Sequence, residues 1–87
     1  MYTKTNVMTI KILAFGITRD ILGGSSLEMQ IPGHTRVADL RATLYAQYPA
    51  LQKLSTLAIA LNTEYASDEE LIGEKDEVVL IPPVSGG

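Results

Sequence analysis

The fold is decided by the stretch TRVADLRATLYAQYP, residues 35–49, which predicts the main helix of the chain. Its large apolar side chains recur at spacings of three and four residues, which places them on one helical face. That apolar stripe consists of Val37, Leu40, Leu44 and Tyr48. Thr35 is a good N-cap candidate, Asp39 places a negative charge in the first turn, and Pro49 ends the pattern. We expect the stripe to pack under a sheet.

Two predicted strands precede this helix. TIKILAF, residues 9–15, is apolar on both faces, which is typical of a central strand. SSLEMQI, residues 25–31, alternates between apolar and polar residues and predicts a half-buried strand, stopped by Pro32 and Gly33. Between the two strands, Thr18 is expected to cap one or two helical turns that end at Gly23 and Gly24.

Further strands follow the helix. LAIALN, residues 57–62, predicts a strand, and a short strand is expected around Tyr65. The acidic stretch SDEELIGEKDE, residues 67–77, predicts a loop or a helical turn anchored by Leu71 and Ile72. The continuous apolar run EVVLIP, residues 77–82, predicts a second central strand, parallel to the first and beside it. These elements indicate an α+β domain, with a mixed sheet of four to five strands covered on one face by one main helix.

Composition limits the chain to one folded domain. It has 87 residues, of which 46% are hydrophobic and 20% are charged. We expect residues 1–8 to be a flexible N-terminal extension, residues 9–81 to form the domain and residues 82–87 to form an extended tail. The apolar run near the start is short and contains Lys11, which indicates neither a membrane span nor an export signal. We therefore expect a cytoplasmic protein.

Several kinds of site are disfavoured. The chain has no cysteine, so it has neither a disulfide framework nor a cysteine nucleophile. His34 is the only histidine and follows a Pro-Gly pair, so we expect a surface residue and no metal site. Residues 54–87 hold seven acidic residues and one lysine. This acidity is either a solvated face or a surface that steers the domain to a basic partner, and it disfavours nucleic acid.

The end of the chain, IPPVSGG, carries the functional prediction. Pro82 and Pro83 fix the backbone and reduce the entropy that is lost when the tail is ordered. Val84, Ser85 and Gly86 add little width, so the tail can enter a narrow site on a partner and present the carboxylate of Gly87. Adenylation by ATP would activate that carboxylate. It would then accept sulfur, as in a carrier, or join a lysine, as in a protein modifier.

The stretch DEVVLIPPVSGG, residues 76–87, closely resembles the C-terminal signature of the small, sulfur-carrying subunits of molybdopterin synthases. IKILAFGITRDILGG, residues 10–24, and the helix with its flank, residues 35–51, are similar to the same family. The resemblance covers residues 8–87. It implies a ubiquitin-like β-grasp fold.

The resemblance also implies a function. Gly87 would be adenylated by a ubiquitin-activating-type adenylyltransferase, converted to a thiocarboxylate and inserted into the large synthase subunit, in an assembly that we expect to be a heterotetramer. It would donate sulfur to cyclic pyranopterin monophosphate, and the large subunit would supply the catalytic side chains. The chain itself would bind no cofactor, because ATP is used by the activating enzyme. Two alternatives stay open: a related carrier for thiamine or cysteine synthesis, and a ubiquitin-like protein modifier.

Overall fold

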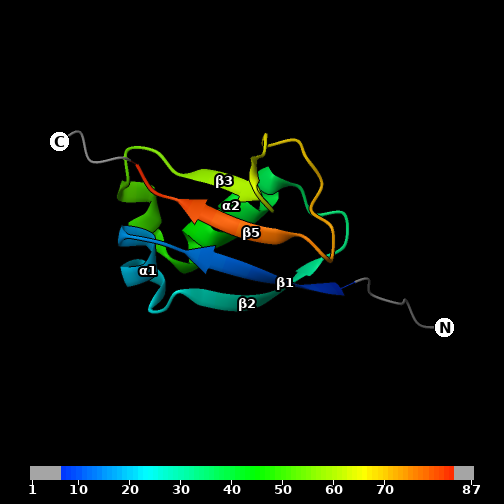
Figure 1. Ribbon diagram of the computed structural model, residues 1–87, viewed down its shortest axis with the longest axis horizontal. Helices are drawn as coiled ribbons and strands as arrows, with labels where there is room; N and C mark the ends of the chain where they lie inside the picture. The colour runs from blue at the N-terminus through cyan, green and yellow to red at the C-terminus, as the bar shows by residue number, and fades with distance from the viewer. Residues whose placement is uncertain (1–6, 84–87) are drawn as a thin grey trace.

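The fold is a single mixed sheet with its helices on one face, seen in a computed structural model that describes residues 7–83. The elements in chain order are β1 (Val7–Ala14), α1 (Ile17–Leu22), β2 (Ser26–Pro32), α2 (Val37–Gln47), the 3-10 helix η1 (Pro49–Lys53), β3 (Ala58–Leu61), β4 (Glu64–Tyr65) and β5 (Glu77–Ile81). The five strands are ordered β2-β1-β5-β3-β4 (Figure 1). This confirms the predicted α+β class.

The two strands predicted to be central are central. β1 pairs with β5 in parallel, from Lys11 opposite Glu77 to Ala14 opposite Leu80. β2 pairs antiparallel with the other edge of β1, and β3 pairs antiparallel with the other edge of β5. β1 begins at Val7, two residues before the predicted start, because Met8 continues the buried alternation of the strand. The rest of the predicted extension, residues 1–6, lies outside the described residues.

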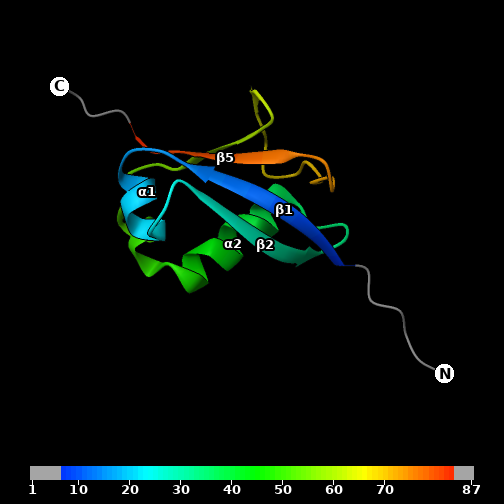
Figure 2. The same cartoon turned by 60° about the horizontal axis from the view of Figure 1, so that its bottom comes forward.

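Both helices cover the same face of the sheet, as Figure 2 shows. The predicted stripe of α2 is confirmed: Val37, Leu40 and Leu44 have no exposed surface, and Tyr48 is partly buried against the core. The inward side chains of the sheet complete this core, namely Met8, Ile10, Ile12, Ile31, Ile59, Leu61, Val78 and Leu80. In the part of the chain that the structure describes, no helix is long and apolar enough to cross a membrane.

The start of α2 differs from the prediction. The N-cap is Arg36, not Thr35. The hydroxyl of Thr35 donates to the carbonyl of Pro32 and is therefore engaged before the helix begins. The first turn of the helix is instead satisfied by the acidic loop: the N–H of Val37 donates to the carbonyl of Glu70 and that of Ala38 to the carbonyl of Asp68, each at 2.9 Å. A segment distant in sequence thus caps the helix.

The start of α1 differs as well. Gly16 precedes the helix, and Thr18 is its second residue rather than its cap. The Oγ1 atom of Thr18 accepts a hydrogen bond from the N–H of Phe15 at 2.9 Å and donates one to the carbonyl of Phe15 at 2.6 Å. The predicted end of the helix is confirmed, because Gly23 adopts the left-handed conformation that terminates it.

The acidic stretch before β5 is a loop, as predicted, but it has one anchor instead of two. Ile72 is buried, whereas the side chain of Leu71 is 51% exposed. The N–H of Ile72 donates to the carbonyl of Thr35 at 2.9 Å, so the loop is held beside the start of α2. That backbone bond orients Ile72 toward the core, and its neighbour Leu71 is left in solvent.

Candidate functional site at the end of the central strand

The candidate site begins where β5 ends. Pro82 and Pro83 follow Ile81 directly and are half-buried. The structure therefore places the first two predicted tail residues at the end of a central strand. The other four, Val84, Ser85, Gly86 and Gly87, lie outside the described residues.

The turn after β1 lies against the base of this tail. Because β1 and β5 are parallel neighbours, both strands end at the same edge of the sheet. A Cβ atom on Gly16 would lie 3.5 Å from Cγ of Pro82, so the turn and the proline ring are in contact distance. Gly16 has φ 58°, a backbone conformation that favours glycine. Gly16 therefore lets the chain turn away from β5 close to Pro82.

The uncovered face of the sheet is apolar around this edge. Leu13 lies opposite Val79 in the register of β1 and β5, and Ile81 follows Val79 on the same face. All three are half-buried, and Phe15, which follows the end of β1 directly, is 54% exposed. We call Leu13, Phe15, Val79 and Ile81 the tail-base surface. It continues directly into Pro82 and is suited to contact a partner that receives the tail.

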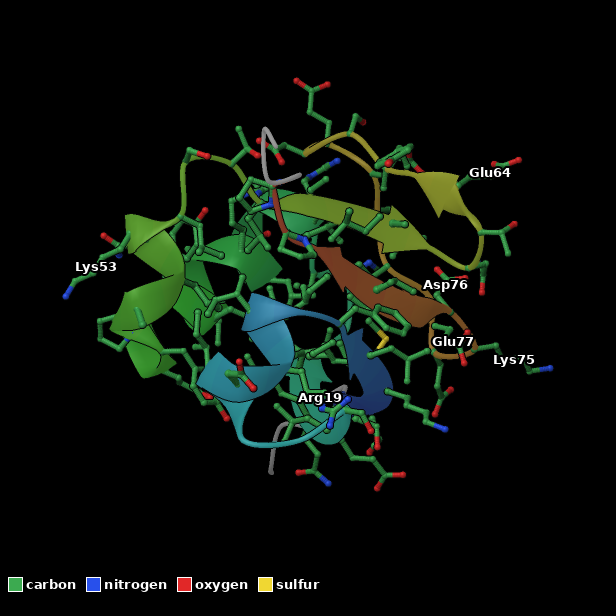
Figure 3. All side chains as sticks on the ribbon, turned by 60° about the vertical axis from the view of Figure 1, so that its left-hand side comes forward. Arg19, Lys53, Glu64, Lys75, Asp76 and Glu77 are labelled. Atoms are coloured by element: carbon green, nitrogen blue, oxygen red, sulfur yellow. The ribbon has the colours of Figure 1, made fainter. Side chains whose placement is uncertain are left out.

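The opposite end of the same uncovered face, where β5 begins, is charged. Lys11 lies between Glu28 on β2 and Glu77 on β5 in the strand register. In Figure 3, Glu64, Asp76 and Glu77 gather on one side of the molecule, with Lys75 beside them, and Lys53 lies on the opposite side. The uncovered face therefore changes from ionic to apolar along β1 and β5, toward the base of the tail.

Titratable groups offer little chemistry within residues 7–83. No three of the His, Cys, Asp and Glu side chains in this range lie close enough to hold a metal ion. His34 is exposed, as expected. Burial acts to lower the pKa of Arg41, but the neighbouring Tyr45 and Asp68 favour the cation, outweigh the burial and raise the pKa. Arg41 therefore stays a cation, which suits a structural role.

A five-stranded mixed sheet with a parallel central pair, one main helix beneath it and a C-terminal segment leaving from the central strand defines a ubiquitin-like β-grasp protein. Within this class the chain belongs to the ThiS family, whose model matches residues 12–87.

Known proteins show the same relation. The molybdopterin synthase sulfur carrier subunit of Chlamydomonas reinhardtii is 37% identical over 83 residues, which cover 92% of this chain and all of that protein. Among solved structures, ubiquitin from Caldiarchaeum subterraneum matches with a TM-score of 0.63 and 27% identity, over 94% of this chain and all of that one. A chain from the complex of subunits 1 and 2 of the molybdopterin-converting factor of Helicobacter pylori matches with a TM-score of 0.64 and 26% identity, over 92% of this chain and all of that one.

Two features of the site were missed by reasoning from sequence. The first is the contact between Gly16 and Pro82, which depends on the parallel pairing of strands far apart in the chain. The second is the bonding of Thr18 to Phe15. The spacing of three residues between them was a usable signal, because Ser and Thr hydroxyls commonly bond to nearby backbone groups.

Proposed function

We propose that the chain is the sulfur-carrier subunit of a molybdopterin synthase. The observation that carries the proposal is the family match, which runs through the Pro-Pro-Val-Ser-Gly-Gly end to residue 87. The geometry supports it, because the tail starts from a central strand held on both sides and next to an apolar surface. A rigid base of this kind lets a partner position the end of the tail.

The proposed chemistry takes place at the carboxylate of Gly87. Its oxygen attacks ATP on an activating enzyme and forms an acyl-adenylate with release of pyrophosphate. A sulfur nucleophile then displaces AMP and leaves a thiocarboxylate. The thiocarboxylate sulfur then displaces an oxygen substituent of cyclic pyranopterin monophosphate and forms a thioester to it. Water cleaves the bond between the Gly87 carbonyl and the sulfur, so that the sulfur stays on the pterin and Gly87 returns to a carboxylate. The carrier binds no cofactor in this scheme, and the use of ATP fits a cytoplasmic location.

The proposed partner for sulfur transfer is a large synthase subunit. The resemblance to a chain from the Helicobacter pylori complex of two subunits supports this partner. Pro82 to Gly86 would occupy the binding groove of the large subunit, and the tail-base surface would contact the area around the entrance. A dithiolene contains two sulfur atoms and each Gly87 carries one. This supports the use of two carriers per product and a heterotetramer of two small and two large subunits.

A protein modifier is the second candidate, and the structural likeness to an archaeal ubiquitin favours it. Conjugation would join Gly87 to a lysine of another protein. Immunoblots of cell extract with an antibody against this chain distinguish the two functions. A modifier gives a ladder of larger species, and a carrier gives a single band.

The direct test is intact-mass spectrometry after incubation with ATP, an activating enzyme and a sulfur donor. The intact chain is expected to gain the mass difference between sulfur and oxygen and to convert the precursor when the large subunit is added. Deletion of Gly87 should abolish conversion with the melting temperature unchanged, because the next carboxylate is displaced by roughly 3.3–3.6 Å. Tyr65→Ala, a change at an exposed position of β4, is the matched control. Conversion by the deletion variant at the rate of the intact chain would refute the proposal.

A further inference from the structure

The ladder between β1 and β5 stops at Ala14 and Leu80, although β5 continues to Ile81. The N–H of Ala14 donates to the carbonyl of Ser25 at 3.0 Å, on the side of β2. Successive residues of a strand direct their backbone groups to alternate edges. The N–H and C=O of Phe15 therefore face β5. The N–H lies on the side of the Leu80 carbonyl, in the last pair of the ladder, and the C=O is the acceptor that the next rung, from the N–H of residue 82, would need.

Thr18 engages both of these groups. Its Oγ1 accepts from the N–H of Phe15 and donates to the C=O of Phe15, and its own N–H donates to the same carbonyl at 3.1 Å. The side chain of Thr18 has no exposed surface. A buried hydroxyl without partners is costly, so these bonds are held firmly. Phe15 thus begins the turn into α1, and its C=O is withdrawn from the sheet.

The segment after β5 also lacks the N–H donor that the next hydrogen bond to β1 would need. The N–H of Asn62 donates to the carbonyl of Glu77 at 2.7 Å, so the odd-numbered residues of β5 face β3. The even-numbered residues face β1, and by this alternation residue 82 faces β1 and residue 83 faces β3. Proline has no N–H to donate. Pro82 therefore removes a donor on the side of β1, and Pro83 removes one on the side of β3.

We propose that Thr18 is a positioning residue that, together with Pro82, ends the central ladder and keeps Pro82 and Pro83 out of the sheet. Thr18 withdraws the acceptor of the next rung, and Pro82 lacks its donor. Only the use of this arrangement rests on the proposed function. Prolines that are excluded from their own sheet stay available to the groove of a partner enzyme.

The test uses amide hydrogen exchange and needs no partner. Pro82→Ala introduces a reporter amide that faces β1, and Pro83→Ala introduces one that faces β3. In the protein with both changes, the two amides should exchange rapidly when Thr18 is present. Thr18→Val keeps the shape and removes the hydroxyl, so the amide at position 82 should then gain about tenfold or more protection. The amide at position 83 should not change, and Thr18→Ser should behave like threonine.

Two results would overturn the inference. The first is protection at position 82 with Thr18 in place, which needs no Thr18 variant to observe. The second is rapid exchange at position 82 in both Thr18→Val and Thr18→Ala, with the amides of β1 and β5 still protected; the Thr18→Ala variant also serves if Thr18→Val does not fold.

A kinetic measurement adds the functional side. With Pro82→Ala, the Thr18→Val change should raise the KM for the large subunit about 3- to 10-fold and leave kcat unchanged, because only the competent fraction falls. Thr18→Ser should restore the KM. If the unaltered chain does not transfer sulfur, the proposed function is contradicted, and the hydrogen-exchange result still stands.

Discussion

Leu44 lies beneath the sheet with no exposed surface, in the core that α2 shares with β1 and β5. Leu44→Ala should lower the free energy of unfolding by roughly 2–5 kcal/mol, because it removes buried methyl groups and leaves a cavity. Leu71→Ala is the control, since Leu71 is half exposed, and should change stability by less than about 0.5 kcal/mol. Urea unfolding of both variants measures the difference. Equal losses would contradict the assignment of Leu44 to the core.

Arg41 makes two contacts that should contribute unequally to the free energy of unfolding. Its guanidinium donates a partly buried hydrogen bond to the carbonyl of Leu57. It also pairs with the exposed carboxylate of Asp68 at 3.1 Å. Asp68→Asn should cost less than about 1 kcal/mol, because exposed ion pairs contribute little. Arg41→Met should cost about 1–3 kcal/mol more, since it also leaves the Leu57 carbonyl without its donor. Thermal unfolding compares them, and a larger loss in Asp68→Asn would reverse the ranking.

The acidic loop before β5 has two roles. Backbone carbonyls of Asp68 and Glu70 cap α2, and the side chains of the loop supply negative charge. Three exposed glutamates outside these caps, Glu69 and Glu74 in the loop and Glu64 on β4, allow the charge to be removed separately. The triple change to glutamine should slow association with a basic partner at low salt and leave the melting temperature nearly unchanged. Stopped-flow association at low and high salt measures this, and a rate insensitive to both would exclude steering.

The elements that were predictable from sequence have a local cause. The period of two in residues 25–31 and the stripe of α2 follow from burial of one face, so strand and helix could be assigned from spacing alone. The N-caps of α1 and α2 could not be assigned in this way. The cap of α2 comes from a loop some thirty residues away, and the exposure of Leu71 follows from the backbone bond of Ile72. Such contacts depend on where the sheet brings distant segments together.

The candidate site likewise has one part that depends on local sequence and one part that depends on the pairing of distant strands. The chemistry proposed at Gly87 was inferred from the sequence alone, because a stiff, narrow segment that leads into Gly-Gly is a local property of the sequence, and it stays a prediction. The base of the site could not be inferred in this way, because the tail-base surface joins residues from β1 and β5 that are more than sixty positions apart. Pairing in the sheet creates that surface.

For the whole molecule, the tail and the tail-base surface should act as one binding unit. Phe15→Ser should weaken binding to the large subunit about 10- to 100-fold, because an exposed aromatic beside the tail is a strong candidate for an interface hot spot. Tyr65→Ser is the matched control, as Tyr65 is 74% exposed on β4 at the sheet edge. Calorimetry of both variants measures the difference. If the two variants bind equally well, Phe15 is not part of the interface.

The parallel pairing of β1 and β5 also determines how the molecule responds to mechanical force. β5 has neighbours on both edges, so a pull on the C-terminus along the strand loads the rungs to β1 and β3 together and in shear. Rungs that share a load resist it far better than rungs that open one after another. We expect the sheet of a carrier built in this way to stay closed each time its tail is withdrawn from a tight groove.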